Sequence, residues 1–137
     1  MQVLLDTSAI LSLSDKSSVI NETVKNLVLN EDHLYIVPST VIVETCQLLK
    51  YRFGAIYEIK FLQEIQLSNF IMETVGFEDI HRIIEILKKY SDLGAGYVDS
   101  SIVAIAERLG TNKIITLDKK HFTVMIPKGF EYFDILV

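Results

Sequence analysis

Short apolar runs alternate with amphipathic stretches along the chain. The apolar runs predict five strands, at residues 3–5, 34–37, 70–75, 113–117 and 132–136. Between them, apolar residues recur at intervals of three and four, the spacing of a helix with one buried face. This spacing is clearest at Ile80, Ile83, Ile84 and Leu87. Short strands that alternate with such helices indicate a parallel sheet covered on both faces, and therefore an α/β fold.

Residues that favour helix ends predict where the helices begin and stop. Asn21 is expected to cap one helix, and Ser39 or Thr40 is expected to cap the helix after the second strand. Gly54 should break that helix in two, and Gly110 should end the last long helix. No linker or repeat interrupts this succession of elements.

The composition fits one globular domain. The chain has 137 residues, of which 50% are hydrophobic, so we expect a single domain over residues 1–137. It shows no secretory signal and no membrane-length apolar run, and its single cysteine suits a reducing compartment. We therefore expect a cytoplasmic protein that makes no membrane contact. The net charge of −5 argues against a broad DNA-binding surface, although a metal ion can offset local charge where a phosphate binds.

Four acidic residues stand where the fold does not need a carboxylate. Asp6 and Asp118 follow the first and fourth strands, Asp99 begins a helical pattern, and Glu44 interrupts an apolar segment. The active site of a parallel sheet lies beyond the carboxyl ends of its strands, so Asp6 and Asp118 should face one crevice. Carboxylates that converge there would repel one another by about 4 kcal/mol per pair at ~4 Å. A divalent cation would relieve this repulsion, so the acids describe a metal pocket.

Simpler explanations exist for each acid. The three aspartates are all suited to helix caps, which is compatible with metal binding. For Glu44 the alternative is a solvated position at the edge of its helix. A capping box would place the glutamate at position 42 or 43, three residues after Ser39 or Thr40, so Glu44 fits neither. Glu44 is therefore the acid that favours the metal pocket.

The ligand types indicate which metal is bound. Carboxylate oxygens favour Mg²⁺ or Mn²⁺ over Zn²⁺. His33, His81 and His121 share no zinc-ligand spacing, although His121 is close enough to Asp118 to be a candidate for substrate contact. The chain has no glycine-rich nucleotide motif and no Gly-x-Ser-x-Gly, so nothing supports a nucleotide cofactor or a serine hydrolase.

Three blocks of sequence carry the aspartates in a distinctive order. They are residues 3–10, 97–110 and 115–122, with Glu44 between the first two. In this order and spacing the chain resembles the PIN-domain nucleases, most closely the VapC-like toxins of type II toxin–antitoxin pairs. The resemblance spans nearly the whole chain.

The resemblance implies both a fold and an activity. The expected fold is a three-layer α/β/α sandwich with a central, mainly parallel five-stranded sheet. The expected activity is Mg²⁺- or Mn²⁺-dependent hydrolysis of RNA phosphodiesters by a homodimeric endoribonuclease that a small VapB-like antitoxin silences. Asp6 and Asp99 would be the most direct metal ligands, and Glu44 and Asp118 would complete the catalytic cluster.

Other side chains are candidates for supporting roles. Ser8 and Thr116 are plausible hydroxyl helpers, and Asp92 is a weaker candidate for anchoring its loop. The basic residues that would hold the RNA backbone are Lys50, Arg52, Lys119 and Lys120; the alternative is ordinary surface charge. The aromatic residues around Gly54 suit either a dimer or partner surface or the core; they are Tyr51, Phe53 and Tyr57.

Two rival functions remain open at this point. One is a receiver-type signalling module, which also has an acidic pocket on a parallel sheet, but whose layout does not predict an acid on a helix at Glu44. The other is a PIN-like subunit that acts by binding RNA or in RNA processing rather than as a toxin. The intact set of acids argues against the second alternative without excluding it.

Overall fold

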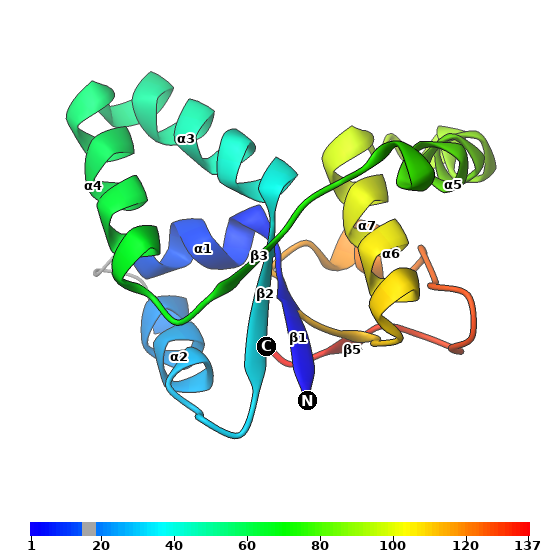
Figure 1. Ribbon diagram of the computed structural model, residues 1–137, viewed down its shortest axis with the longest axis horizontal. Coiled ribbons are helices and arrows are strands. Elements are labelled where there is room, and N and C mark those ends of the chain that lie inside the picture. The colour runs from blue at the N-terminus through cyan, green and yellow to red at the C-terminus, as the bar shows by residue number, and fades with distance from the viewer. Residues whose placement is uncertain (15–18) are drawn as a thin grey trace.

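One parallel sheet organises the molecule (Figure 1). The computed structural model describes residues 1–14 and 19–137. The sheet has five strands in the order β3-β2-β1-β4-β5, and every neighbouring pair is parallel. The strands are β1 (Gln2–Leu5), β2 (Leu34–Pro38), β3 (Ile71–Glu73), β4 (Lys113–Ile115) and β5 (Asp134–Ile135). The mainly parallel five-stranded sheet that we predicted is thus confirmed, and it is parallel throughout.

Helices cover both faces of this sheet. They are α1 (Thr7–Ser14), α2 (Val19–Val28), α3 (Ser39–Phe53), α4 (Ala55–Leu67), α5 (Phe77–Lys89), α6 (Tyr97–Leu109) and α7 (Lys119–Phe122), with a short 3₁₀ helix, η1 (Ser91–Leu93). Figure 1 shows α1, α2 and α4 on one side of the strands and α5, α6 and α7 on the other, which confirms the three layers. None of the helices within the described residues has both the length and the apolar character needed to cross a membrane.

The core lies between the central strands and these helices. Val3, Leu4 and Leu5 of β1 are fully buried, and so are Ile114 and Ile115 of β4. This burial agrees with the continuous apolar runs that a covered parallel sheet requires. Helix α6 is buried all round between residues 100 and 106, because it packs on β1 and β2 and is flanked by α3 and α5. Its first turn is therefore held rigidly at the carboxyl edge of the sheet.

The helix stops follow the sequence, but the caps predicted at Asn21, Ser39 and Thr40 were wrong. Gly54 separates α3 from α4, and Gly110 ends α6 in the left-handed conformation with φ of 69°. Asn21 lies inside α2, where its side-chain amide donates to the backbone oxygens of Ser12 and Leu13 at 2.8 and 3.0 Å. It therefore ties α2 to the C-terminus of α1 instead of capping its own helix.

The predicted caps at Ser39 and Thr40 were also wrong. Both residues lie within the first turn of α3, which has Pro38 at its N-cap position and no side-chain cap. Thr40 Oγ1 instead lies 2.7 Å from Ser101 Oγ on α6, so that hydroxyl is used between helices. The contact between α3 and α6 therefore uses a hydroxyl that its local sequence position predicted to cap the helix.

Two other predictions need correction in detail. The third, fourth and fifth strands are shorter than the apolar runs that predicted them, because pairing with β2, β1 and β4 involves only two or three residues. In α5, Ile84 belongs to the predicted apolar face but is 45% exposed, whereas Ile86 is fully buried. The face that packs inward runs through Asp79, Ile83 and Ile86.

A buried acid explains why that face is shifted. Asp79 accepts the Gly76 backbone N–H at 3.1 Å and receives Arg108 Nε at 3.1 Å. Arg108, at the end of α6, also donates to Glu73 and to the backbone oxygen of Thr74. Arg108 therefore connects α6 with the end of β3 and the start of α5, and this connection fixes the rotation of α5 on α6.

The two isoleucines of α5 provide a matched test of this packing. Ile86→Ala should lower the free energy of unfolding by about 2–5 kcal/mol, because it leaves a cavity in the core. Ile84→Ala removes the same atoms from a half-exposed position and should cost less than about 1 kcal/mol. Denaturant unfolding of both variants would measure the difference, and equal losses would contradict the rotation described here.

Candidate functional site

Asp6 is the most buried of the four acids. It follows β1 directly, its side chain is almost completely enclosed, and its backbone N–H donates to Ile115 of β4 at 3.1 Å. Its carboxylate accepts the Thr7 N–H at 2.7 Å and the Thr116 hydroxyl at 2.7 Å. Burial raises the pKa of Asp6, and the charges of Asp118 and Glu44 raise it further, although the two hydrogen bonds oppose the shift.

Two hydroxyl groups connect Asp6 to the segment after β4. Thr116 Oγ1 donates to Asp6 and accepts the Asp118 N–H at 2.9 Å. Ser8 Oγ lies 3.3 Å from Asp6 Oδ2 and accepts the Leu117 N–H at 2.9 Å. The sequence singled out both hydroxyls, and the structure places both against Asp6. They hold the ends of β1 and β4 in one arrangement around a buried carboxylate.

Asp99 and Asp118 meet at His121. Asp118 is the N-cap of α7: its Oδ1 accepts the His121 backbone N–H at 3.0 Å. Its Oδ2 lies 2.6 Å from His121 Nδ1, and Asp99 Oδ2 lies 3.3 Å from the same nitrogen. Ligand atoms of these three residues all lie within 4.8 Å of one another, close enough to hold one metal ion.

Asp99 is not a helix cap, since it is the third residue of α6 and Gly96 occupies the N-cap position. The pKa of Asp99 is raised from 3.8 to about 6, chiefly by burial. The charges of Asp6, Asp118 and Glu44 contribute to this rise, and His121 opposes it. The folded chain thus favours a proton at this position when nothing else neutralises it.

Glu44, on α3, lies outside the group of Asp99, Asp118 and His121 whose ligand atoms come within 4.8 Å of one another. It is half-buried, and it forms no hydrogen bond or ion pair with the residues that the structure describes. Its charge nevertheless raises the pKa of both Asp6 and Asp99, so the four acids act electrostatically as one cluster. A half-buried carboxylate without a protein donor is available to bind a cation or a water molecule.

The remaining candidates differ in their distance from this cluster. His121 is the residue whose role the sequence underestimated, and the signal was its position three residues after Asp118, the spacing of a helix cap and its first turn. Asp92 is exposed in η1 and contacts none of the acids. The basic residues proposed for RNA binding are all exposed; they are Lys50 and Arg52 on α3, and Lys119 and Lys120 on α7.

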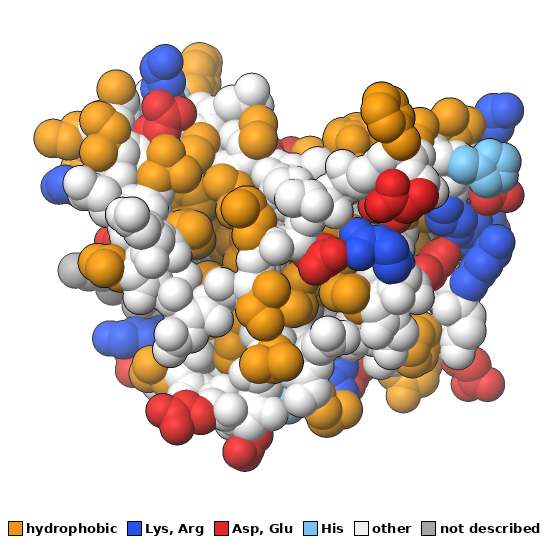
Figure 2. Space-filling view, in the orientation of Figure 1, with side chains coloured by type: hydrophobic (Ala, Val, Ile, Leu, Met, Phe, Trp, Pro, Cys, Tyr) orange, Lys and Arg blue, Asp and Glu red, His pale blue; other side chains and the backbone are white. Residues whose placement is uncertain are grey.

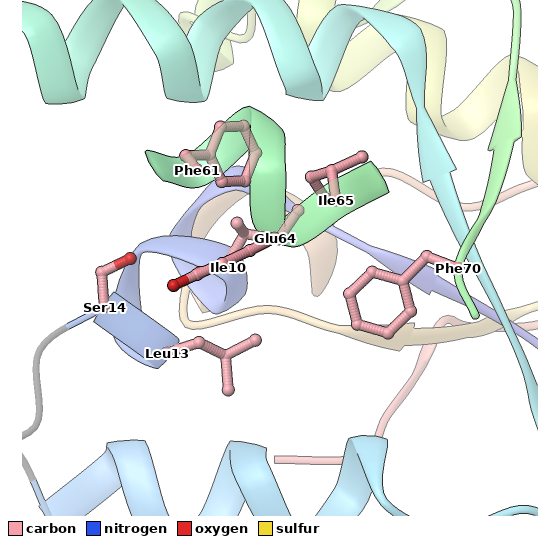
Figure 3. A pocket seen from close by; sticks show the side chains of 7 residues that line it. All are labelled: Ile10, Leu13, Ser14, Phe61, Glu64, Ile65 and Phe70. Carbon is pink, nitrogen blue, oxygen red and sulfur yellow. The ribbon is translucent and has the colours of Figure 1, made fainter. Parts of the chain in front are cut away.

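Two hollows lie beside α1. A cavity of about 60 Å³ is enclosed by α1, α4 and Phe70, as Figure 3 shows, and it has room for little more than water. None of the four acids lines it. A groove of about 640 Å³ lies between α1, the α3–α4 hairpin and Leu117, and it includes Ser8, the residue hydrogen-bonded to Asp6. Only the groove adjoins the acid cluster.

The fold and the site define a class of protein. A parallel sheet between two helical layers, with carboxylates converging at its carboxyl edge, is an architecture suited to binding a divalent cation beside an anionic substrate. The model of the PIN domain family matches residues 3–125. The chain belongs to the PIN domain family.

Relatives of known structure or name agree with this membership. The protein named Ribonuclease VapC26, from Mycobacterium tuberculosis, is 28% identical over 134 residues, which are 98% of this chain and 99% of the relative. The crystal structure of M. tuberculosis VapC20, described as a sarcin-ricin loop cleaving toxin, superposes with a TM-score of 0.75 at 21% identity and covers 85% of this chain and 89% of its own.

A second solved structure has the same fold in a complex. It is VapBC2 from Rickettsia felis bound to a fragment of promoter DNA, with a TM-score of 0.63 at 17% identity, covering 85% of this chain and 87% of that one. The predicted resemblance to VapC-like PIN proteins is confirmed by these matches. Membership of this family removes the receiver-type alternative.

Removal of the Asp99 charge should stabilise the metal-free chain at neutral pH. The raised pKa means that the folded state binds this proton more tightly than the unfolded state. The resulting stabilisation is complete below pH 3.8 and is lost as the pH rises through about 6. Asp99→Asn should therefore raise the free energy of unfolding at pH 7, and the gain should shrink towards pH 4.

Urea unfolding in EDTA over this pH range would measure the effect. The exposed Asp92→Asn serves as the control, because it removes a carboxylate outside the cluster. Equal stability of wild type and Asp99→Asn at pH 7 would contradict the raised pKa of Asp99.

Proposed function

We propose that this chain is a Mg²⁺- or Mn²⁺-dependent endoribonuclease that hydrolyses RNA phosphodiester bonds and serves as the toxin of a toxin–antitoxin pair. The observation that carries the proposal is the electrostatic coupling of Asp6, Glu44, Asp99 and Asp118, four acids from separate segments of the chain. The raised pKa of Asp6 and of Asp99 reflects a site with too much negative charge. A divalent cation bound among these carboxylates would neutralise their negative charge, so that they would not need to take up protons.

The donor set fits such an ion. The four acids offer carboxylate oxygens, the ligands that Mg²⁺ and Mn²⁺ prefer. Asp6 and Asp99 would hold the cation most directly, with Asp118 and Glu44 completing the site. When bound, the cation would polarise the phosphodiester and make a water molecule more acidic.

The protein's own groups would perform the positioning. Thr116 and the Thr7 N–H hold the Asp6 carboxylate in one orientation. Glu44, which has no donor among the described residues, is free to accept a hydrogen bond from the attacking water and to orient it. Lys119 and Lys120, exposed beside Asp118 on α7, would attract the RNA backbone.

The toxin role and the partners are proposals that rest on the relatives. Similarity to Ribonuclease VapC26 over almost the full chain supports RNA as the substrate. The solved complex of VapBC2 supports a small VapB-like antitoxin as the partner. The cytoplasmic location of the pair stays a prediction from the sequence. A homodimer would bury apolar side chains that are exposed outside both hollows, such as Ile56 and Ile59 of α4.

Replacement of Asp6 tests the proposal as a whole. Asp6→Asn keeps the shape of the side chain but removes a ligand, so Mg²⁺-dependent cleavage of total RNA should fall at least about 100-fold, a loss of several kcal/mol in cation-assisted catalysis. Expression of the wild-type chain without a partner should arrest growth, and expression of Asp6→Asn should not.

Asp92→Asn is the matched control and should cleave as the wild type does. Circular dichroism and the melting temperature would establish that Asp6→Asn remains folded. Undiminished cleavage by Asp6→Asn would refute the nuclease assignment. RNA cleavage without growth arrest would instead favour the alternative of a PIN-like subunit in RNA processing.

His121 should matter through Asp118. Because its ring nitrogen lies 2.6 Å from Asp118 Oδ2, His121→Ala should leave that carboxylate poorly oriented and weaken Mn²⁺ binding about 10- to 100-fold, as loss of a group behind a metal ligand does. Calorimetric titration with Mn²⁺ would measure the affinity. The exposed His81→Ala is the control, and unchanged affinity in His121→Ala would show that the imidazole does not support the site.

A further inference from the structure

We infer that the groove between α1 and the α3–α4 hairpin holds a nucleobase of single-stranded RNA adjacent to the bond that is cut. The inference rests on the proposed nuclease function and adds to it the part of the substrate that the chain recognises. The groove has a volume of about 640 Å³, and its lining is formed by Ser8, Leu11, Ser12, Ser14, Leu49, Arg52, Phe53, Tyr57 and Leu117.

One end of the groove is part of the acid site. Ser8 Oγ lies 3.3 Å from Asp6 Oδ2, and it accepts the backbone N–H of Leu117 at 2.9 Å. Leu117 directly precedes Asp118 in the chain. A phosphodiester held at the acids would therefore lie beside Ser8, and the groove that Ser8 lines would be open to an adjacent nucleotide of the same strand.

The other end carries the groups that single-stranded RNA requires. Phe53 and Tyr57 are 59% and 47% exposed although they are large aromatic residues. Their ring centroids lie 5.4 Å apart with the planes tilted by 45°, so the two rings line the groove without being stacked face to face. Proteins bind unpaired bases by stacking them on aromatic side chains of this kind.

Positive charge accompanies these rings. Arg52 lines the groove and forms no ion pair within the part of the chain that the structure describes. Lys60 Nζ lies 5.5 Å from the centre of the Tyr57 ring. In a chain with a net charge of −5, two cations beside exposed aromatic rings favour a ligand that is both anionic and aromatic. Arginine suits this ligand, since its planar group pairs with phosphate and also stacks on bases.

Apolar side chains also line the groove. Leu11 and Leu49 belong to the lining together with Ser8 and Phe53. Figure 2 shows that hydrophobic side chains also gather over α3 and α4 on the face it displays, so an apolar surface alone does not distinguish the groove. What distinguishes the groove is that its lining also includes Arg52 and includes Ser8, whose hydroxyl lies 3.3 Å from Asp6 Oδ2.

The test compares the removal of aromatic rings that line the groove with the removal of a neighbouring ring that does not. Phe53→Ala with Tyr57→Ala removes both rings from the groove, whereas Tyr51→Ala removes an 89% exposed ring of α3 that does not line it. The substrate is a synthetic single-stranded RNA spanning a site that the wild-type chain cleaves in total RNA. The double variant should raise KM roughly 5- to 100-fold, the usual effect of losing one stacked base, with kcat changed less than about threefold; Tyr51→Ala should change neither.

Abasic substitution identifies the base concerned. Replacing the nucleotides around the cleaved bond one at a time with abasic residues should raise the wild-type KM at one position. At that position the double variant should show no further rise, because the ring and the base are two halves of the same contact. Circular dichroism of each variant would show whether it is folded. Because both rings are exposed, we expect the double variant to keep its fold.

The outcomes separate this inference from the proposed function. If the wild-type chain cleaves no RNA, both fail. If it cleaves RNA but the double variant has an unchanged KM, or the abasic and ring effects simply add, the groove is not a base subsite and the nuclease function stands. Loss of antitoxin binding by the double variant with an unchanged KM would assign the groove to a protein partner and overturn the inference.

Discussion

The parallel pairing of β1 with β4 brings Asp6 against Thr116, two residues that lie 110 positions apart in the chain. A carboxylate buried to this degree is costly unless donors surround it. Here the Thr7 N–H and the Thr116 hydroxyl both point at its oxygens. The same hydroxyl accepts the N–H of Asp118. A change in the register of this one strand pair would displace every other group of the site.

The site combines strong positioning with unrelieved charge. Hydrogen bonds fix Asp6 and Asp118, yet the pKa of Asp6 and of Asp99 is raised. A cluster of carboxylates that served only a structural role would be expected to have basic side chains nearby to offset its negative charge. Within the described residues, the only such group among the acids is His121, which contacts two of them. An excess of carboxylate charge held in place is a state that a divalent cation can neutralise.

The surroundings give the site a rigid wall and a more open one. On one side, α6 is buried along most of its length, and Arg108 anchors its end to β3 and α5. On the other side, a groove lies between the α3–α4 hairpin and α1, and Phe53 and Tyr57 of the hairpin are exposed there. The rigid side positions Asp99, and the open side leaves space beside Asp6 for part of a substrate. The chemistry and the recognition we propose therefore rest on different halves of the fold.

Much of the fold was predictable because its signals are local. The apolar runs at β1 and β2, the helical spacing in α5 and α6, and the stops at Gly54 and Gly110 each depend on a few neighbouring residues. The caps at Asn21 and Ser39 were predicted wrongly because tertiary partners competed for the same polar groups or because the helix began earlier. Ile84 was misassigned because buried Asp79 and its ion pair rotate the inward face of α5.

The sequence by itself determined that three aspartates stand at the ends or starts of elements, and that Glu44 interrupts an apolar segment where it has no role as a cap. Their placement follows from periodicity and polarity, which are local properties of the chain. Only the tertiary structure decided that His121 joins Asp99 and Asp118, that Thr116 holds Asp6, and that the groove opens beside Ser8. Those contacts depend on strand order and on helix packing between residues far apart in sequence, and no local pattern specifies them.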